Sequence, residues 1–488
     1  MRLTHLMKGL EYESKGNLEL LDAELSELVF DSRKAKAGTV FLALKGTNAD
    51  GHDYIDKAIS QGAEIVVCER IDNFVPSVLY IQVGNSHHAL GIMACNFYDN
   101  PSKQLKLVGV TGTNGKTTVA TLLYKLFRAM NQHVGLISTV ENRIDDKVLE
   151  STHTTPDPVS LNKLIAEMRD SGCDYVFMEV SSHAVDQDRI AGLDFDGAIF
   201  TNISHDHLDY HGTFQNYIYA KKKFFDQLPS HAFALVNYDD KRGMVMLQNT
   251  EAKKYGFSLK SLSDFKAKIL ENSIDGLLLE IDGRELHSRL VGDFNAYNLL
   301  SVYAVALLLG EEKDEVLKLI SNLSAAEGRF DYLRNETNDI SAIVDYAHTP
   351  DALEKVLLTL QKMCGNGRII TVVGCGGDRD KSKRPLMAKI ASNYSDIALL
   401  TSDNPRSESP EVILAEMESG IQAHAKSKVL IIADRRQAIK AACRLAQRGD
   451  IVLVAGKGHE KYQEINGMKN PFDDKEELLM ALEITNQT

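Results

Sequence analysis

The chain has 488 residues, a formal net charge of −13 and 44% hydrophobic residues. At roughly 100–200 residues per domain, this length predicts about three domains, each large enough for its own core. The acidic balance argues against nucleic acid as a partner. No uninterrupted apolar run approaches the roughly 18 residues of a membrane-spanning helix, so we expect no membrane insertion.

The six cysteines show no paired spacing, and the N-terminal residues lack the apolar region of a signal peptide. Cysteines scattered in this way are typical of reduced, mostly buried thiols rather than of disulfides or a zinc site. We therefore expect a cytoplasmic protein. We also expect it to be a monomer.

Residues 1–103 form the first predicted domain, a small α/β unit. We expect strands at 29–33 and 39–44 and a helix at 53–61. The turn-forming cluster Asn100-Pro101-Ser102 marks the end of this domain.

The second predicted domain, 104–332, alternates apolar strands with helical patterns. Strands are expected at 105–110, 175–180 and 198–203, and helices at 119–130, 160–171 and 215–227. The apolar segment 299–309 is expected to be a core helix. This alternation is typical of a doubly wound, largely parallel sheet, here of the P-loop type.

In the third predicted domain, 333–488, the alternation starts again. Strands are expected at 340–345, 369–374, 397–401, 429–433 and 451–455, and helices at 351–363, 409–424 and 436–447. The pattern predicts a Rossmann-like parallel sheet, so the expected fold class is α/β throughout.

Residues 111–118 read Thr-Gly-Thr-Asn-Gly-Lys-Thr-Thr, between a predicted strand and a predicted helix. Such a turn places backbone N–H groups around a phosphate at the positive end of a helix dipole. Lys116 would contact the outer phosphates, and the Thr117 hydroxyl would hold Mg²⁺. Val110 stands where the strict pattern has a small residue, so this is a variant phosphate loop. An isolated Gly-Lys-Thr is common, but the whole pattern favours binding of a nucleoside triphosphate, for which ATP is expected.

Two further polar groups follow predicted strands of the second domain, namely Glu179 and the His- and Asp-rich run 202–211. A buried, unpaired carboxylate is costly, and Mg²⁺ beside the phosphates would give Glu179 a partner. The alternative is that Glu179 caps a neighbouring helix. The run 202–211 fits a polar loop, a hydrolase metal site or, beside a phosphate loop, a single magnesium-binding histidine.

Strands of the third domain end in groups of mixed charge. Arg379 and Arg406 suit bidentate recognition of carboxylates, and Glu460 suits an ammonium group. Together they predict a pocket for a zwitterionic amino acid. The alternative is an ordinary network of surface salt bridges.

Six motifs, in order along nearly the whole chain, resemble the signature series of the Mur ligases, the ATP-dependent amide ligases of peptidoglycan precursor synthesis. They are the phosphate loop 111–118, Glu-Val-Ser-Ser-His at 179–183, His-Leu-Asp-Tyr-His-Gly at 207–212, Gly292-x-x-Asn295-x-x-Asn298, Asp-Tyr-Ala-His-Thr-Pro at 345–350 and Ala-Gly-Lys-Gly-His-Glu at 455–460. Residues 403–406, Asp-Asn-Pro-Arg, are similar to the form of the family that adds meso-diaminopimelate. The lysine-adding relatives lack the arginine.

The resemblance implies a site for ATP and Mg²⁺. The implied phosphate-binding residues are Gly112, Thr113, Asn114, Gly115, Lys116, Thr117 and Thr118, and those for adenine, phosphate and ribose are Asn295, Arg329 and Asp345. One Mg²⁺ would be held by Thr117 and Glu179, and a second by Glu179, His207 and a carbamylated Lys221 (N6-carboxylysine). The implied catalytic residues are Lys116, Lys221, His207 and Glu179.

Two substrate sites are implied in the same way. The implied residues for UDP-N-acetylmuramoyl-L-alanyl-D-glutamate are Phe30, Ser32, Thr47, Asn48, Ala49, Thr154, Thr155, Ser181, Gln187 and Arg189. The implied residues for diaminopimelate are Arg379, Asp403, Asn404, Pro405, Arg406, Gly456 and Glu460. Phe30, Thr47 and Asn48 differ from the family's usual uracil-site residues.

The implied reaction joins meso-diaminopimelate to the D-glutamate γ-carboxylate through an acyl phosphate, with ATP as co-substrate. The alternatives are a ligase that adds L-lysine, a ligase like folylpolyglutamate synthetase, a nucleotide-regulated binding or transport protein, and a metal-dependent hydrolase. The domain before the phosphate loop and the Asp-Asn-Pro-Arg sequence argue against a folylpolyglutamate synthetase. The phosphate loop argues against the hydrolase.

Overall fold

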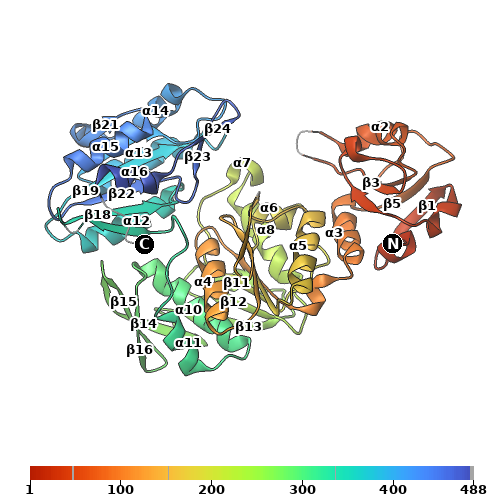
Figure 1. Cartoon of the computed structure of the whole chain (residues 1–488), viewed down its shortest axis with the longest axis horizontal. Helices are drawn as coiled ribbons and strands as arrows, with labels where there is room; N and C mark the ends of the chain where they lie inside the picture. Colours follow the sequence, from red (N-terminus) through yellow and green to blue (C-terminus); the bar gives the residue numbers. More distant parts are fainter. Residues whose placement is uncertain (47–48, 152, 336, 484–488) are drawn as a thin grey trace.

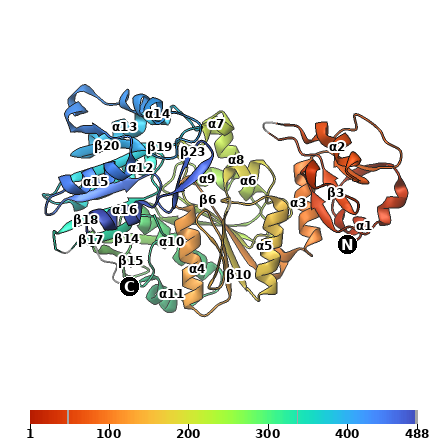
Figure 2. The ribbon, with the colours of Figure 1, turned by 45° about the horizontal axis from the view of Figure 1, so that its top comes forward.

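The computed structural model describes residues 1–46, 49–151, 153–335 and 337–483. Three units, each with its own main sheet, lie in a row, with the N-terminal and C-terminal units on opposite sides of the central one (Figure 1, Figure 2). All six cysteines are free. Within the described ranges, no helix has the length and apolar character needed to cross a membrane.

The N-terminal unit is a five-stranded sheet in the order β1-β5-β4-β3-β2, parallel except for β1. Its elements are α1 (Leu3–Leu6), β1 (Tyr12–Gly16), η1 (Leu18–Asp22), β2 (Glu27–Val29), η2 (Ser32–Lys34), β3 (Thr39–Leu42), η3 (Gly51–Tyr54), α2 (Ile55–Ser60), β4 (Ile65–Cys68), β5 (Leu79–Val83), α3 (Ser86–Phe97) and η4 (Pro101–Gln104).

Two expected elements of this unit have wrong bounds. The strand expected at 29–33 shares only Val29 with β2, because the Asp31 side chain accepts a hydrogen bond from the Arg33 N–H at 3.0 Å and starts a 3₁₀ turn. The helix expected at 53–61 is α-helical only from Ile55, since the Asp50 side chain caps a preceding 3₁₀ turn.

Close packing joins the N-terminal unit to the central unit through α3 and α5 (Pro158–Asp170). Asn85 Nδ2 donates to Asp188 Oδ2 at 3.0 Å, and Cys95 Sγ donates to Ala191 O at 3.7 Å. A Cβ on Gly91 would lie 2.7 Å from the Cβ of Ala191, so only glycine permits this approach of α3.

The central unit is an eleven-stranded sheet in the order β16-β15-β14-β13-β12-β11-β6-β10-β7-β8-β9. The strands from β14 to β7 in that order are parallel, and antiparallel pairs extend the sheet at both ends. Its elements are β6 (Lys106–Thr111), α4 (Lys116–Ala129), β7 (Val134–Ile137), β8 (Asn142–Ile144), β9 (Lys147–Leu149), α5, β10 (Tyr175–Glu179), α6 (Ser182–Asp186), β11 (Gly197–Phe200), α7 (Leu208–His211), α8 (Phe214–Asp226), β12 (Phe233–Asn237), α9 (Gly243–Met246), β13 (Lys253–Ser258), β14 (Phe265–Ser273), β15 (Gly276–Ile281), β16 (Arg284–Ser288), α10 (Asp293–Leu308) and α11 (Lys313–Ile320).

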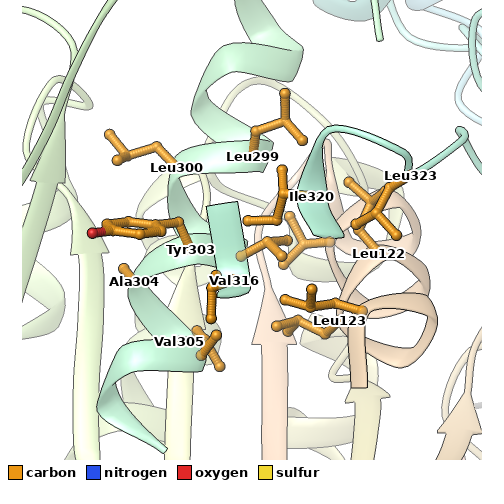
Figure 3. Close-up of a cluster of buried hydrophobic side chains, with 14 of the residues drawn as sticks. Leu122, Leu123, Leu299, Leu300, Tyr303, Ala304, Val305, Val316, Ile320 and Leu323 are labelled. Atoms are coloured by element: carbon orange, nitrogen blue, oxygen red, sulfur yellow. The ribbon is translucent and has the colours of Figure 1, made fainter. Parts of the chain in front are cut away.

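Both faces of the central sheet are buried, because alternate side chains of its strands meet helices on opposite sides. Val108 and Val110 of β6 belong to the same buried cluster as Leu122 of α4 and Leu299 of α10, part of which is drawn in Figure 3. Leu107 belongs to the cluster under α5 and α8. Two buried faces account for the continuous apolar strands seen in the sequence.

The C-terminal unit is a six-stranded sheet in the order β17-β18-β22-β19-β20-β21, parallel except for β17. A separate two-stranded ribbon, β23–β24, follows β22. The elements are β17 (Asp331–Asn335), β18 (Ile340–Asp345), α12 (Pro350–Met363), β19 (Ile369–Cys375), α13 (Lys383–Tyr394), β20 (Ile397–Ser402), α14 (Pro410–Glu418), η5 (Ala423–Lys428), β21 (Val429–Ile431), α15 (Arg435–Leu445), β22 (Ile451–Ala455), β23 (Tyr462–Ile465), β24 (Met468–Pro471) and α16 (Asp474–Ala481).

The helix expected at 409–424 is wrong beyond Glu418, where α14 ends. Gly420 follows at a point where a Cβ would collide with Pro385 O, and a 3₁₀ helix then begins at Ala423. The strand expected at 429–433 ends at Ile431. The α/β fold class, with a doubly wound central sheet and a Rossmann-like C-terminal sheet, is confirmed.

Candidate active site

Three neighbouring strands of the central sheet end at the same edge. β6 lies between β10 and β11, with Val110 in register with Glu179 and Thr111 in register with Phe200. The phosphate-loop sequence follows β6, and Glu179 is the last residue of β10. In open parallel sheets, ligands bind beyond the carboxyl ends of strands, at positions like this one.

The phosphate loop adopts a conformation that requires its glycines. Gly112 and Gly115 have φ of +154° and +90°, and a Cβ on Gly112 would collide with Thr201 Oγ1. Lys116 begins α4, and its Nζ donates to Gly112 O at 2.9 Å and to Thr113 O at 3.0 Å. The ammonium group is therefore held at the N-terminus of a helix, where an anion binds favourably.

Glu179 is a buried carboxylate with one unpaired oxygen. Its Oε1 accepts a hydrogen bond from the Thr139 N–H at 2.7 Å, whereas its Oε2 has no hydrogen-bond partner among the described residues. An unpaired buried carboxylate oxygen is costly, and a divalent cation would offset that cost. Thr117, expected to bind the same cation, is also buried, and its Oγ1 accepts a hydrogen bond from Arg329 Nη2 at 3.1 Å.

The described residues contain no group of three or more His, Cys, Asp or Glu side chains placed to hold a metal ion. The predicted ligands are the Thr117 hydroxyl, the Glu179 carboxylate and the His207 imidazole. Only two of them are side chains of these four types, so they do not form a group of three. Oxygen donors from the protein completed by phosphate oxygens nevertheless suit Mg²⁺, which is usually bound by one or two carboxylates together with a substrate's phosphates.

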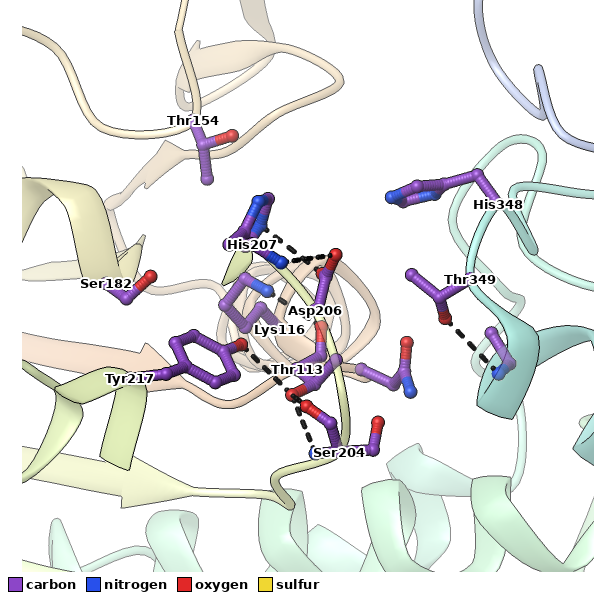
Figure 4. A network of polar contacts seen from close by, with 12 residues as sticks. Thr113, Lys116, Thr154, Ser182, Ser204, Asp206, His207, Tyr217, His348 and Thr349 are labelled. Atoms are coloured by element: carbon purple, nitrogen blue, oxygen red, sulfur yellow. Dashed lines mark hydrogen bonds and ion pairs between the residues drawn. The ribbon is translucent and has the colours of Figure 1, made fainter. Parts of the chain in front are cut away.

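His207 lies beside Asp206 in the loop after β11 (Figure 4). Its Nε2 is 3.3 Å from Asp206 Oδ2, and its φ is +52°. Burial lowers the pKa of His207 to about 3, against the opposing effect of Asp206. The imidazole is therefore neutral at pH 7, which is the form that can bind a metal. Figure 4 also shows His207 and Thr154 facing His348 of the C-terminal unit.

Lys221 reaches the phosphate loop from α8. Its side chain is buried, and its Nζ donates to Gly112 O at 2.9 Å and lies 4.9 Å from the centre of the Tyr217 ring. Burial lowers the pKa of Lys221 well below its usual range, and the nearby Lys116 lowers it further. A larger fraction of the amine is then neutral and nucleophilic.

The three residues expected to contact adenine, phosphate and ribose line a cavity of about 610 Å³ together with the phosphate loop. Arg329 lies over the Tyr346 ring, with 4.2 Å between the guanidinium carbon and the ring centre. Asn295 Nδ2 donates to Val291 O at 2.8 Å, and Asp345 Oδ2 accepts from the backbone at 2.7 Å. The sequence motif contained Tyr346 but gave it no role.

Asp345 should make the ligand-free protein less stable as the pH rises. Burial raises its pKa to about 6, whereas an unfolded chain loses this proton near pH 4. The folded state therefore holds the extra proton between about pH 4 and 6, and stability falls across that window. We expect Asp345→Asn to raise the denaturant midpoint more at pH 8 than at pH 4.5. An equal change at both pH values would contradict this. Asp339→Asn is the contrasting control, because Arg334 holds the pKa of that half-buried carboxyl below its usual range.

The residues expected to bind the muramoyl dipeptide form a network beside Glu179. Thr155 Oγ1 donates to Glu179 O at 2.9 Å, and Arg189 Nη1 donates to Thr155 O at 2.8 Å. Arg189 also donates to Gln187 Oε1 at 2.7 and 3.0 Å. The other two predicted residues, Thr154 and Ser181, line the 610 Å³ cavity. The network places five predicted residues at one edge of the nucleotide cavity.

The predicted uracil-site residues lie in the N-terminal unit, apart from that cavity. Phe30 is 40% exposed, Ser32 is buried and Ala49 is exposed. Thr47 and Asn48 lie outside the described residues.

Most of the predicted amino-acid residues meet at the carboxyl ends of β20 and β22. Asn404 Nδ2 donates to Glu460 Oε2 at 2.7 Å. Lys457, fully buried, donates to Asn404 Oδ1 at 2.9 Å and to Glu460 Oε2 at 3.1 Å. A Cβ on Gly456 would lie 2.6 Å from Asp403 Oδ2. Glu460, predicted to bind a ligand's ammonium group, is thus already paired with Lys457, a residue of the sequence motif for which no role was predicted.

Arg406, another predicted amino-acid residue, is held by two contacts of its own. Its Nη1 donates to Gly377 O at 2.7 Å, and its Nε is 3.4 Å from Glu464 Oε2. The neighbouring Pro405 packs so closely that a Cβ on Gly377 would collide with its carbonyl oxygen. Arg379 is exposed. These residues do not line the 610 Å³ cavity, so the structure holds two separate clusters at strand ends.

Three family models match the chain in series. They are described as the Mur ligase family catalytic domain at residues 24–98, the Mur ligase middle domain at 110–306 and the Mur ligase glutamate ligase domain at 328–458. A protein of Cytophaga hutchinsonii is 57% identical over 466 residues, covering 94% of this chain and 96% of the relative. The chain belongs to the Mur ligase family.

The relative from Cytophaga is named UDP-N-acetylmuramoyl-L-alanyl-D-glutamate–2,6-diaminopimelate ligase. A Bacteroides thetaiotaomicron protein of the same name is 52% identical over 481 residues, or 98% of this Mur ligase and 99% of the relative. The predicted family and the enzyme class, an ATP-dependent amide-bond ligase of peptidoglycan synthesis, are confirmed.

A solved structure of a ligase of that name matches 99% of both chains with a TM-score of 0.70 and 32% identity. The ADP complex of MurF ligase from Thermotoga maritima matches with a TM-score of 0.60 at 20% identity. Folylpolyglutamate synthase from Mycobacterium tuberculosis, complexed with ADP and AMPPCP, covers 76% of this Mur ligase at 18% identity and a TM-score of 0.63. The last two likenesses establish the fold alone.

Proposed function

We propose that this Mur ligase joins meso-diaminopimelate to the D-glutamate γ-carboxylate of UDP-N-acetylmuramoyl-L-alanyl-D-glutamate, converting ATP to ADP and phosphate. The observation that carries the proposal is Arg406, a half-buried guanidinium held at the end of β20 beside Asn404 and Glu460. A guanidinium suits the far carboxylate that distinguishes diaminopimelate from lysine. The names of the relatives that share over half of its residues support the same substrate.

The phosphate loop and Lys116 would hold the ATP phosphates in the cavity between the central and C-terminal units. The γ-carboxylate attacks the γ-phosphoryl group, the bond to ADP breaks, and an acyl phosphate forms. Lys116 neutralises charge on the phosphoryl group during this transfer. The neutral amine of the amino acid then attacks the acyl carbon, and phosphate leaves.

Thr117, Glu179 and His207 would hold Mg²⁺, and the unpaired Oε2 of Glu179 supports this assignment. When bound, the cation neutralises negative charge on the phosphates. We assign Lys221 as a carbamate, formed when its neutral amine adds to CO₂ and releases a proton. The carbamate replaces a positive charge beside Lys116 with a negative one, which removes a repulsion between the two lysines.

The N-terminal unit would bind the uridine end of the nucleotide sugar through the region of Phe30, Ser32 and Ala49. Thr155, Gln187 and Arg189 would bind the peptide end, because their hydrogen-bonded network leads from the N-terminal side to Glu179. The amino acid would bind the C-terminal unit, so all three units contribute to one reaction.

One assay tests the proposal directly: phosphate release with the UDP-muramoyl dipeptide, ATP and each candidate amino acid in turn. We expect turnover with meso-diaminopimelate and about a hundredfold lower kcat/KM with L-lysine, because lysine lacks the far carboxylate that the half-buried guanidinium of Arg406 would bind. Comparable efficiency with both amino acids would contradict the specificity and leave the ligase assignment standing. ATP turnover that needs no amino acid would contradict the ligation itself.

Arg406→Ala should lose about a hundredfold in kcat/KM for diaminopimelate while the KM values for ATP and the UDP substrate change little. Because Arg406 also donates to Gly377 O, the thermal midpoint must be measured beside the kinetics. Arg448→Ala, at an exposed ion pair of the same unit, is the matched control. If Arg406 only braces the loop, its loss will lower the thermal midpoint and leave the preference for diaminopimelate over lysine unchanged.

A further inference from the structure

We propose that Asp351 is a positioning residue that ties the phosphate loop to the C-terminal unit. Asp351 lies in the first turn of α12, just after the N-cap residue Thr349, and its Oδ2 accepts hydrogen bonds from both central-unit loops that surround the nucleotide site. The site assignments above give it no role. It does not itself line the 610 Å³ cavity, so it acts through the loops that do.

The geometry at Asp351 joins three segments at one oxygen. Asn114 Nδ2 of the phosphate loop lies 2.9 Å from Oδ2, and Ser204 Oγ of the loop after β11 lies 3.0 Å from it. Lys355 Nζ, one turn along α12, donates to the same oxygen at 2.8 Å and holds the carboxylate in place. Hydrogen bonds to a charged acceptor are among the stronger ones in proteins.

The two central-unit donors belong to one preassembled structure. The Asn114 N–H donates to Asn202 Oδ1 at 3.0 Å, and Thr201 Oγ1 donates to Asn114 O at 2.6 Å. The Ser204 N–H donates to Thr113 Oγ1 at 3.0 Å. The backbone of both loops is therefore bonded within the central unit, and the side chains of Asn114 and Ser204 are the parts that reach across to α12.

The consequence is a mechanical link between the two clusters of the active site. The amino-acid cluster belongs to the C-terminal unit and the phosphate loop to the central unit, so the amine reaches the acyl phosphate only when the units hold one relative position. Asp351 connects that position directly to Asn114, two residues before Lys116. Loss of the link should leave each cluster intact and impair their alignment.

Kinetics of three variants test the link. Asp351→Ala should lower kcat about tenfold or more, with little change in the KM for ATP. Asp351→Asn keeps an acceptor oxygen and should recover most of the rate. Ser204→Ala should lower kcat less than Asp351→Ala does. The double variant Asp351→Ala/Ser204→Ala should lose no more of its kcat than Asp351→Ala alone, because both changes remove the same contact. Additive losses, or a wild-type kcat in Asp351→Ala, would overturn the proposal.

A distance measurement separates the link from a general loss of folding. Spin labels at Met244→Cys in the central unit and Val412→Cys in the C-terminal unit lie on exposed positions, and Cys364→Ser removes the one cysteine that is not buried. With ADP bound, we expect a narrow distance distribution that broadens in Asp351→Ala and not in the control Asp339→Asn. An unchanged distribution in Asp351→Ala would overturn the proposal. This measurement needs no amino acid, so its outcome is independent of the proposed diaminopimelate specificity.

Discussion

Replacing Lys116 by alanine is expected to lower ATP-dependent ligation by about a thousandfold or more, equivalent to roughly 4 kcal/mol of transition-state stabilisation. The Lys116 ammonium group is held over the loop by two carbonyl oxygens at 2.9 and 3.0 Å, at the N-terminus of α4. A triphosphate that replaces those contacts would receive the full charge of the side chain. The measurement is initial phosphate release at saturating ATP, UDP substrate and amino acid.

Lys125→Ala provides the matched control for this variant. Lys125 lies on the same helix, but its Nζ donates to Ser324 and Ala325 carbonyl oxygens outside the nucleotide cavity. We expect its rate to stay within about threefold of the wild type, as is usual for substitutions away from a site. A Lys116→Ala enzyme with near-normal turnover and an unchanged thermal midpoint would show that the phosphate loop is misassigned.

Lys221→Ala should be nearly inactive, with a loss of about a hundredfold or more. The amine is fully buried beside Gly112 O and Tyr217, and among the residues that the structure describes no carboxylate forms an ion pair with it. An unmodified ammonium group there would repel both Lys116 and a bound cation, whereas a carbamate attracts them. Added bicarbonate cannot restore a carbamate on alanine, but a short carboxylate such as acetate or propionate has room to enter and should restore part of the rate.

Two observations would contradict the role of Lys221. One is an intact-mass and density measurement that finds an unmodified lysine in an active, ligand-bound enzyme. The other is full activity of Lys221→Ala without any added acid. Lys223→Ala is the control. Lys223 lies two residues further along α8, and its side chain donates to Asp188 instead.

The position of the candidate phosphate loop beside Glu179 could be predicted from the sequence because it follows from chain order and hydrophobic pattern. Apolar runs near 105–110 and 175–180 become β6 and β10, and parallel neighbours bring Glu179 beside the loop at 111–118. The motif series also identified the family. Local hydrogen bonds explain some of the errors in element ends, as at Asp31, whose side chain starts a turn where a strand was expected.

Other parts of the site depend on contacts between distant segments and could not be predicted. Tyr346 stacks on Arg329, Lys457 donates to Asn404 across 53 positions of sequence, and Asp351 meets Asn114 across 237 positions. Each of these side chains is of a common type in an ordinary-looking loop. Lys457 gains its partner from the folding of the C-terminal unit, whereas Asp351 gains Asn114 only from the relative position of the C-terminal and central units.

The close packing at Gly91 holds the N-terminal unit at a fixed distance from the phosphate loop. With α3 pressed against Ala191 and bonded through Asn85 and Cys95, this unit has little freedom to swing toward the phosphate loop. If the proposed uridine site lies in this unit, the protein sets the distance from the uridine to a carboxylate beside Glu179. A nucleotide sugar with its peptide one residue shorter or longer would then bind through its uridine and place its carboxylate away from the phosphate loop, so the enzyme would select its substrate by length.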